Sequence, residues 1–400
     1  MPNSRCCATR QRPLWAVSKA SRHDSGTASE RAFHASRASR YRCANRTSKC
    51  SICSPSAKSP AAMPLRTRSV SSPSSSIWCR FRTDGSRLAR WRGTVGRPKK
   101  GGSDLPARLL TASILVPGVL YVIYLGGLYV LITVVIFVLL GQREFYGLIE
   151  DKGAHPIVGF GLAAGASLPV VAYLGNEYHA TVLMTVTLLV VMLAQLGRRE
   201  ITESLASISG TFFGVFYVGW LLSHAVVLRE FYTQVVSRHG VQAAQDLQLA
   251  PECGAFLLVY CLAVLVLCDA GAYFAGRAYG KRPLALRISP GKTVEGAIGG
   301  VLLGSLGGVA VKSVFDLIWP DLSAGLGYTA AAGFGVVISI VGIVGDLVES
   351  LLKRDAARKD AGALLPGMGG ILDRIDAPLL GIPVTYYLML FYVWLEVGPS

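Results

Sequence analysis

Residues 255–275 read AFLLVYCLAVLVLCDAGAYFA, an apolar stretch in which Asp269 is the only charged residue. About 20 apolar residues in a helix cross the hydrocarbon core of a bilayer, so this run is a candidate membrane span. The whole chain has the same character, because 52% of its 400 residues are hydrophobic and 16% are charged. Ordinary soluble domains are about 25% charged. This composition excludes an ordinary water-soluble enzyme.

Similar apolar runs recur on both sides of this stretch. We predict an all-α, polytopic integral membrane protein with about nine transmembrane helices. The second run is short and follows the first after Gly126 and Gly127, so these two could form one broken hairpin. The predicted spans cover residues 109–125, 128–140, 156–174, 181–196, 208–228, 255–275, 295–315, 326–344 and 378–395.

The first hundred residues differ from this body in charge and composition. They hold 22 of the 40 Lys and Arg residues, three of the 24 acidic residues, 19 serines and six of the nine cysteines. The basic charge therefore belongs to a tail that cannot bury a core, and it does not indicate nucleic-acid binding. We predict a disordered Arg/Ser-rich extension over residues 1–103 and a membrane-embedded domain over 104–400.

Four interpretations of the tail stay open: an inert extension with a later true start, a transit peptide, a lipid-binding arm, and half a zinc site at Cys50 and Cys53. The remaining cysteines, Cys253, Cys261 and Cys268, lie in an apolar run. They imply no disulfide framework.

The cations of the body predict the orientation, because Lys and Arg are retained in cytoplasmic loops. With the amino terminus inside and an odd number of spans, nearly every body cation falls on the cytoplasmic side. Arg108, which precedes the first span, is on that side as well, and the exceptions are Arg229, Arg238 and Lys312 on the opposite face. We therefore expect both strongly basic loops, near residues 277–292 and 353–374, to face the cytoplasm.

These two loops also hold most of the glycines, prolines and carboxylates that could do chemistry. Cations beside glycine-rich backbone can bind polyphosphate, and carboxylates among them can hold Mg²⁺ between protein and phosphates. The alternative is a pair of solvated loops with glycine turns. Asp269 and Asp346 weigh against that alternative, because each lies at the end of an apolar run where an unpaired carboxylate is costly.

The second loop carries a long motif. It consists of Ser350, Lys353, Arg354, Lys359, Asp360, Gly362, Pro366, Gly367, Met368, Gly369, Gly370, Asp373, Arg374 and Asp376. This pattern resembles the signature of the phosphatidate cytidylyltransferases (CDP-diacylglycerol synthases). The strings DAGAY from Asp269 and SPGKTVEG from Ser289, together with Arg108 and EFY from Glu144, are also similar to that family. The resemblance covers roughly residues 104–397.

The resemblance implies transfer of the cytidylyl group of CTP to phosphatidate in the membrane, with Mg²⁺ and room for a second cation. It places the metal site at Asp346 and Asp373. The further catalytic positions that it implies are Lys353, Arg354, Lys359, Asp360, Arg374 and Asp376, and the substrate-binding positions are Asp269, Ser289, Lys292, Thr293, Glu295, Gly369 and Gly370. Met368 stands where the family usually has His. Either that His is a loop-packing residue, which is the interpretation we favour, or this chain is impaired.

Several alternatives remain at this point. Another CTP-dependent lipid cytidylyltransferase or a lipid kinase would share these features, whereas a secondary transporter would need polar residues at mid-membrane depth, which we do not find. A homodimer is left open. The membrane is the bacterial inner membrane, or an organellar one if the tail is a transit peptide.

Overall fold

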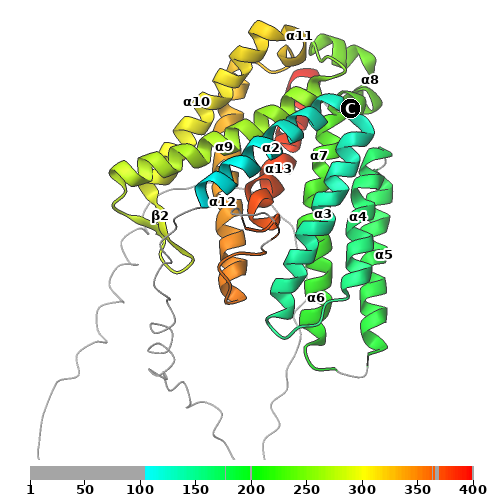
Figure 1. Cartoon of the computed structure of the whole chain (residues 1–400). Coiled ribbons are helices and arrows are strands. Elements are labelled where there is room, and N and C mark those ends of the chain that lie inside the picture. The colour runs from blue at the N-terminus through cyan, green and yellow to red at the C-terminus, as the bar shows by residue number, and fades with distance from the viewer. Residues whose placement is uncertain (1–103, 176, 199–200, 363, 365–368, 399–400) are drawn as a thin grey trace, which may run out of the picture. The chain divides into compact units, whose positions relative to one another are not determined.

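The structure is a computed structural model that describes residues 104–175, 177–198, 201–362, 364 and 369–398. The tail and Met368 lie outside these residues, so the predictions made for them are not addressed by the structure. The described chain is almost entirely helical, as predicted (Figure 1). Its elements are α2 (Asp104–Leu125), α3 (Gly127–Glu150), α4 (Val158–Tyr173), α5 (Glu177–Leu196), α6 (Ser204–Gly214), the π-helical turn η1 (Val215–Trp220), α7 (Leu221–Arg229), α8 (Phe231–Asp246), α9 (Cys253–Tyr279), β1 (Pro283–Ala285), β2 (Ser289–Thr293), α10 (Val294–Ile318), α11 (Pro320–Ser323), α12 (Tyr328–Asp355) and α13 (Leu372–Val397).

Within the described residues, seven helical segments are long and apolar enough to cross a membrane. They include α6, η1 and α7, which join into one span over Ser204–Arg229. Two further predicted spans coincide with shorter apolar helices at Thr111–Leu125 and Val158–Tyr173. An all-α membrane protein is therefore confirmed, and the number nine stays a prediction.

The predicted second span was too short. Helix α3 runs to Glu150, although the apolar run ends near residue 140. The polar side chain of Gln142 is buried, and its amide nitrogen donates to Tyr146 Oη at 2.6 Å and to the Gly161 carbonyl at 2.8 Å. Because these buried acceptors on α3 and α4 bind the Gln142 amide, the helix can continue through polar residues. Hydropathy alone cannot indicate this continuation.

A sharp turn joins α2 to α3. Gly126 has a φ of 68°, a left-handed conformation that glycine adopts without steric penalty. The buried Arg229 packs against it, donates from Nε to the Ile123 carbonyl at 3.0 Å and forms an ion pair with Glu252. A side chain at Gly126 would overlap this guanidinium. The first two runs are therefore separate helices joined by one pinned turn.

The helices form two neighbouring groups. Helix α9 packs against α10 and α12, and α3 packs against α4 and α7, while α13 contacts both α12 and α7 (Figure 1). Small residues let α9 and α10 approach closely: a Cβ at Gly271 would lie 2.7 Å from the Gly299 carbonyl oxygen. The largest fully buried side chains include Tyr146, Phe256, Tyr260 and Met389.

The basic loops meet at one end of this bundle. Arg198 donates to the His155 carbonyl at 2.7 Å, which joins the α5–α6 and α3–α4 loops. Lys152 pairs with Asp355 at 2.6 Å, and Arg358 pairs with Asp151, so the α3–α4 loop also holds the end of α12. These contacts place the predicted catalytic loop beside the other basic loops.

Candidate active site

A short hairpin carries the first basic loop. Strands β1 and β2 pair antiparallel, with Pro283 opposite Thr293. Thr293 Oγ1 accepts a hydrogen bond from the Gly296 amide at 3.1 Å and so caps α10, whereas the Glu295 carboxylate accepts the Lys281 and Arg282 amides, each at 3.1 Å. Both side chains therefore shape the hairpin, and their predicted contact with substrate stays a prediction.

A cleft of about 430 Å³ opens beside this hairpin, and we call it the hairpin cleft. Its walls include Asp269 and Tyr273 of α9, Lys292 of β2 and Asp346 of α12. Gly276, Gly291 and Gly296 also line it, so its wall carries little side-chain bulk there. Ligand pockets commonly measure about 300–1,000 Å³. The cleft therefore has the size and the mixed charge that a phosphate-bearing ligand with a cation requires.

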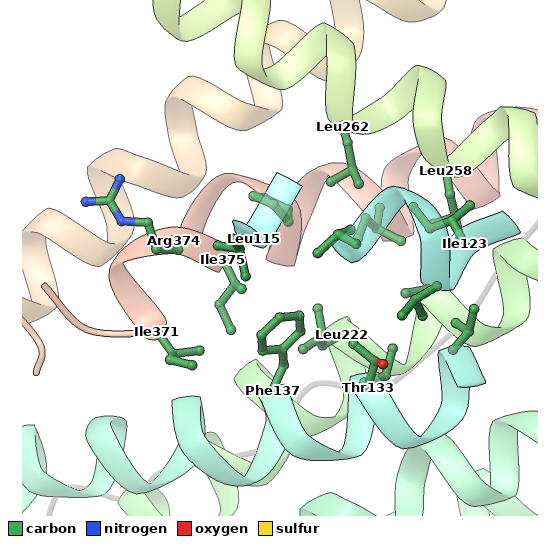
Figure 2. A pocket seen from close by; sticks show the side chains of 17 residues that line it. Leu115, Ile123, Thr133, Phe137, Leu222, Leu258, Leu262, Ile371, Arg374 and Ile375 are labelled. Carbon is green, nitrogen blue, oxygen red and sulfur yellow. The ribbon is translucent and has the colours of Figure 1, made fainter. Parts of the chain in front are cut away.

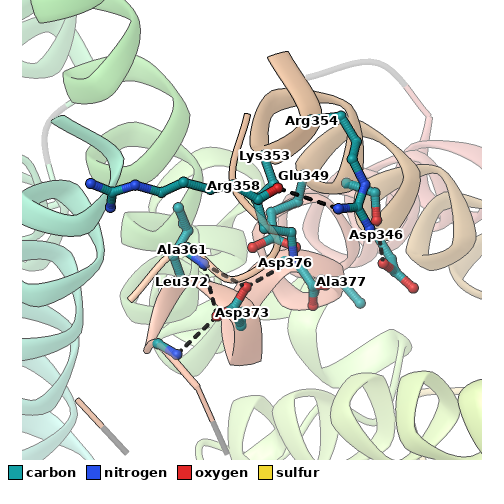
Figure 3. Close-up of polar contacts among 12 residues, drawn as sticks. Asp346, Glu349, Lys353, Arg354, Arg358, Ala361, Leu372, Asp373, Asp376 and Ala377 are labelled. Carbon is teal, nitrogen blue, oxygen red and sulfur yellow. Dashed lines mark hydrogen bonds and ion pairs between the residues drawn. The ribbon is translucent and has the colours of Figure 1, made fainter. Parts of the chain in front are cut away.

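Three carboxylates converge at the α12 edge of this cleft. Ligand oxygens of Asp346, Glu349 and Asp376, here called the acidic cluster, all lie within 4.8 Å of one another. Asp346 and Glu349 are one turn apart on α12, and Asp376 comes from the beginning of α13 (Figure 3). Like charges this close repel, so the arrangement favours nearby cations or a shared proton.

Two lysines supply part of that charge. Lys292 Nζ forms an ion pair with Asp346, and the two side chains are 28% and 30% exposed. Lys353 Nζ lies 2.6 Å from Glu349 Oε2. Glu349 itself is fully buried, and its Oε1 has no hydrogen-bond partner among the described residues. An unpartnered buried carboxylate oxygen is costly, so the acidic cluster has unused capacity for a cation.

Asp373 lies beside the acidic cluster rather than within it. Its Oδ1 accepts from Lys353 Nζ at 2.8 Å, and its Oδ2 accepts the amides of Gly370 at 2.8 Å and Ala361 at 3.1 Å (Figure 3). Lys353 thus bridges Glu349 and Asp373. The expected role of Asp373 as a metal ligand stays a prediction, whereas Asp376, which the sequence ranks after Asp346 and Asp373 as a candidate ligand, joins Asp346 in the acidic cluster.

Two further carboxylates, Glu349 and Glu144, lie at this site although no role is predicted for them from the sequence. Glu349 carries a local signal, because its spacing from Asp346 places both on one helix face. Glu144 of α3 is buried, and its Oε2 accepts the Leu372 amide at 2.8 Å, across 228 residues of sequence. Side chains at Gly362 or Gly370 would overlap this carboxylate. Glu144 therefore fixes the described ends of the loop between α12 and α13.

The remaining predicted residues surround this centre. Arg354 donates to the carbonyls of Ile288 at 3.5 Å and Arg358 at 3.4 Å, which ties the hairpin to α12. Lys359 and Asp360 are exposed in the loop after α12, and Arg374 is exposed on the first turn of α13. Ser289 begins β2, and Gly369 takes a φ of 87°, next to Gly370.

The sequence matches a known family. Residues 106–392 fit the model of the cytidylyltransferase family. The chain belongs to this family. A phosphatidate cytidylyltransferase of Synechocystis sp. is 31% identical over 291 residues, which are 70% of this chain and 94% of that protein.

Two further relatives align over different extents. Phosphatidate cytidylyltransferase 5, chloroplastic, of Arabidopsis thaliana is 31% identical over 66% of this chain and 67% of its own length. The phosphatidate cytidylyltransferase of Haemophilus influenzae is 39% identical over 145 residues, and the chain spans 48% of that protein. As a cytidylyltransferase family member, the chain combines a nucleotidyltransferase site with membrane-spanning helices.

Proposed function

We propose that this chain transfers the cytidylyl group of CTP to phosphatidate and forms CDP-diacylglycerol and pyrophosphate. The observation that carries the proposal is the acidic cluster at the edge of a glycine-lined cleft, with Lys292 paired to Asp346 between them. Binding of a nucleotide triphosphate is favoured by cations and by carboxylates that could hold a metal ion, and this arrangement offers both.

The reaction needs positioning more than proton transfer. An oxygen of the phosphatidate monoester bonds to the α-phosphorus of CTP, and the bond from that phosphorus to the oxygen bridging to the β-phosphate breaks. Pyrophosphate leaves with the electron pair of that bond. Because the attacking monoester is already anionic near neutral pH, a strong general base is not required, and a proton carrier at position 368 is unnecessary. Catalysis then depends on bringing two polyanions together and stabilising charge at the α-phosphoryl group.

A divalent cation suits the acidic cluster. Among the described residues, Glu349 Oε1 is buried without a partner beside two further carboxylates, an oxygen donor set of the kind that Mg²⁺ prefers. We assign Asp346, Glu349 and Asp376 as the residues that would hold it, and Asp373 as a residue that positions Lys353. When bound, such an ion supplies positive charge to phosphoryl oxygens and orients them.

The cations have separate roles in this proposal. Lys292 lies on the wall of the hairpin cleft, where it can neutralise a nucleotide phosphate. Lys353 is held between Glu349 and Asp373, so it balances carboxylate charge and keeps the beginning of α13 against α12. Arg374 is a charged residue on the first turn of α13 and already has an interaction partner. We assign it to the lipid phosphate.

The catalytic end faces the cytoplasm in this proposal. The loops that meet there carry all the cations of residues 104–400 except Arg108, Arg229, Arg238 and Lys312, and such loops are retained on the cytoplasmic side. Residues 104–400 then form the catalytic domain, and residues 1–103 are an extension that catalysis does not need. The enzyme acts in the bacterial inner membrane, or in an organellar membrane if the extension is a transit peptide.

Labelled CTP tests the reaction directly. Purified full-length protein in mixed micelles with phosphatidate and Mg²⁺ should transfer label from [α-³²P]CTP, but not from [γ-³²P]CTP, into the lipid fraction, with one pyrophosphate released per lipid product. Label from the γ-position in lipid would indicate a lipid kinase. Absence of label from both positions would refute the proposal.

A further inference from the structure

An apolar cavity of about 180 Å³ lies among α2, α3, α7, α9 and α13 (Figure 2). Thr133 and Arg374 are the two polar residues on its wall, and all the others are apolar. Apolar cavities of roughly this size, about 150 Å³, stay dry and take up apolar molecules. Water and nucleotide are therefore unsuitable occupants, and hydrocarbon is a suitable one.

Helix α13 connects this cavity to the acidic cluster. Ile371, Ile375 and Pro378 follow a helical spacing of four and three residues, and they line the cavity. Asp373 and Asp376 fall on the opposite face of the same turns, where the carboxylates lie (Figure 3). One helix diameter, about 10 Å, therefore separates the carboxylate chemistry from the apolar wall.

The cavity is elongated along the helices and has its cation at one end. Its wall follows α13 from Ile371 to Ile382, about 16 Å at 1.5 Å per residue. Figure 2 shows Arg374 at the Ile371 end, with its guanidinium directed away from the cavity. A molecule with an anionic phosphate and a hydrocarbon chain matches this distribution of charge.

Helix α2 forms the outer wall. Leu115 and Val119 line the cavity, whereas Ile114 and Tyr121 on the same helix are 67% and 62% exposed. Such apolar exposure suits contact with lipid in a membrane protein. One helix layer thus lies between the cavity and the predicted bilayer.

We propose that this cavity holds one acyl chain of phosphatidate, with the lipid phosphate beside Arg374. This inference rests on the proposed function and adds to it the part of the chain that recognises the lipid tail. Thr133 of α3 and Ala225 of α7 are the cavity residues whose enlargement would shorten the space available to the chain.

Substrate chain length tests the inference. We compare wild-type protein with Thr133→Phe and Ala225→Phe on dihexanoyl- and dipalmitoyl-phosphatidate in mixed micelles. Ile132→Phe is the matched control, because Ile132 adjoins Thr133 but is 49% exposed outside the cavity. The filled variants should lose about tenfold in kcat/KM for the dipalmitoyl lipid, the effect of withdrawing about two methylene groups from apolar contact. Their turnover of the dihexanoyl lipid should stay within about twofold of wild type, which also reports an intact fold.

Equal changes on both lipids, or a selective loss in Ile132→Phe, would overturn the inference. Failure of the wild type on both lipids would instead refute the proposed function. A second measurement does not depend on turnover: a phosphatidate with a diazirine at the end of one acyl chain is photolysed on the protein. The label should fall on residues of the cavity wall such as Leu115 and Phe137, and Thr133→Phe should reduce it. Label confined to outward-facing residues would contradict the assignment.

Discussion

Replacement of Glu144 by alanine should disable the site without altering any residue of the hairpin cleft or the acidic cluster. The Glu144 carboxylate accepts the Leu372 amide at 2.8 Å, and Leu372 is completely buried at the start of α13. A buried amide without an acceptor costs about 1–3 kcal/mol. The docked state of the loop before α13 should be destabilised by this free energy. If the whole of it adds to the activation barrier, the rate of cytidylyl transfer should fall by roughly 5- to 140-fold.

The glutamine variant separates hydrogen bonding from charge. Glu144→Gln keeps a carbonyl oxygen that can accept the Leu372 amide, so it should retain clearly more activity than Glu144→Ala. Glu150→Ala is the control, because Glu150 is also on α3 but is exposed. Its ion pair with Arg143, at 3.8 Å, is long and exposed and therefore weak. The assay is initial rate with labelled CTP, accompanied by hydrogen exchange at the Leu372 amide, which should increase in Glu144→Ala. Equal loss in the alanine and glutamine variants, or alanine activity within about twofold of wild type, would refute the reasoning.

Four further predictions concern the metal, the topology, the tail and the motif. Asp346→Asn and Asp376→Asn should each raise the Mg²⁺ concentration for half-maximal turnover by about tenfold or more, and an unchanged Mg²⁺ titration would exclude that residue as a ligand. In protein whose tail cysteines are serine, Ala285→Cys should react with an impermeant thiol reagent from the cytoplasmic side alone; labelling from outside would reverse the topology. Deletion of residues 1–100 should leave the specific activity of correctly inserted protein within about twofold, since this composition forms no core. Met368→His should raise the rate less than about tenfold, because a gain of about 10² is expected of a restored acid or base.

Local patterns predicted most of the helices and several residues of the site. The runs of apolar residues gave the membrane spans, since length and hydropathy are sufficient for that inference. They failed for α3, because the amide nitrogen of Gln142 donates to Tyr146 and to a carbonyl on α4 that no local pattern identifies. The same limit applies to the acidic cluster. The spacing of Asp346 and Glu349 is readable on one helix, but the approach of Asp376 depends on how α13 packs against α12.

Long-range contacts could not be predicted from the sequence at all. The bond between Glu144 and Leu372 joins residues 228 positions apart, and the pair of Lys292 with Asp346 joins a strand to a helix. Each requires that two separate elements pack in one particular way. A single sequence shows which residues could form such pairs, but it does not show which residue pairs with which.

The attachment of the catalytic loop to α3 has a consequence for biosynthesis. Asp151, Lys152 and Glu144 hold the loop near Arg358, Asp355 and Leu372, so an early segment of the chain fixes a late one. During translation the early helices enter the membrane long before α13 is made, and contacts of such large sequence separation form last. The nascent chain is therefore inserted with an incomplete active site. It becomes able to catalyse the reaction only when its final helix, α13, docks.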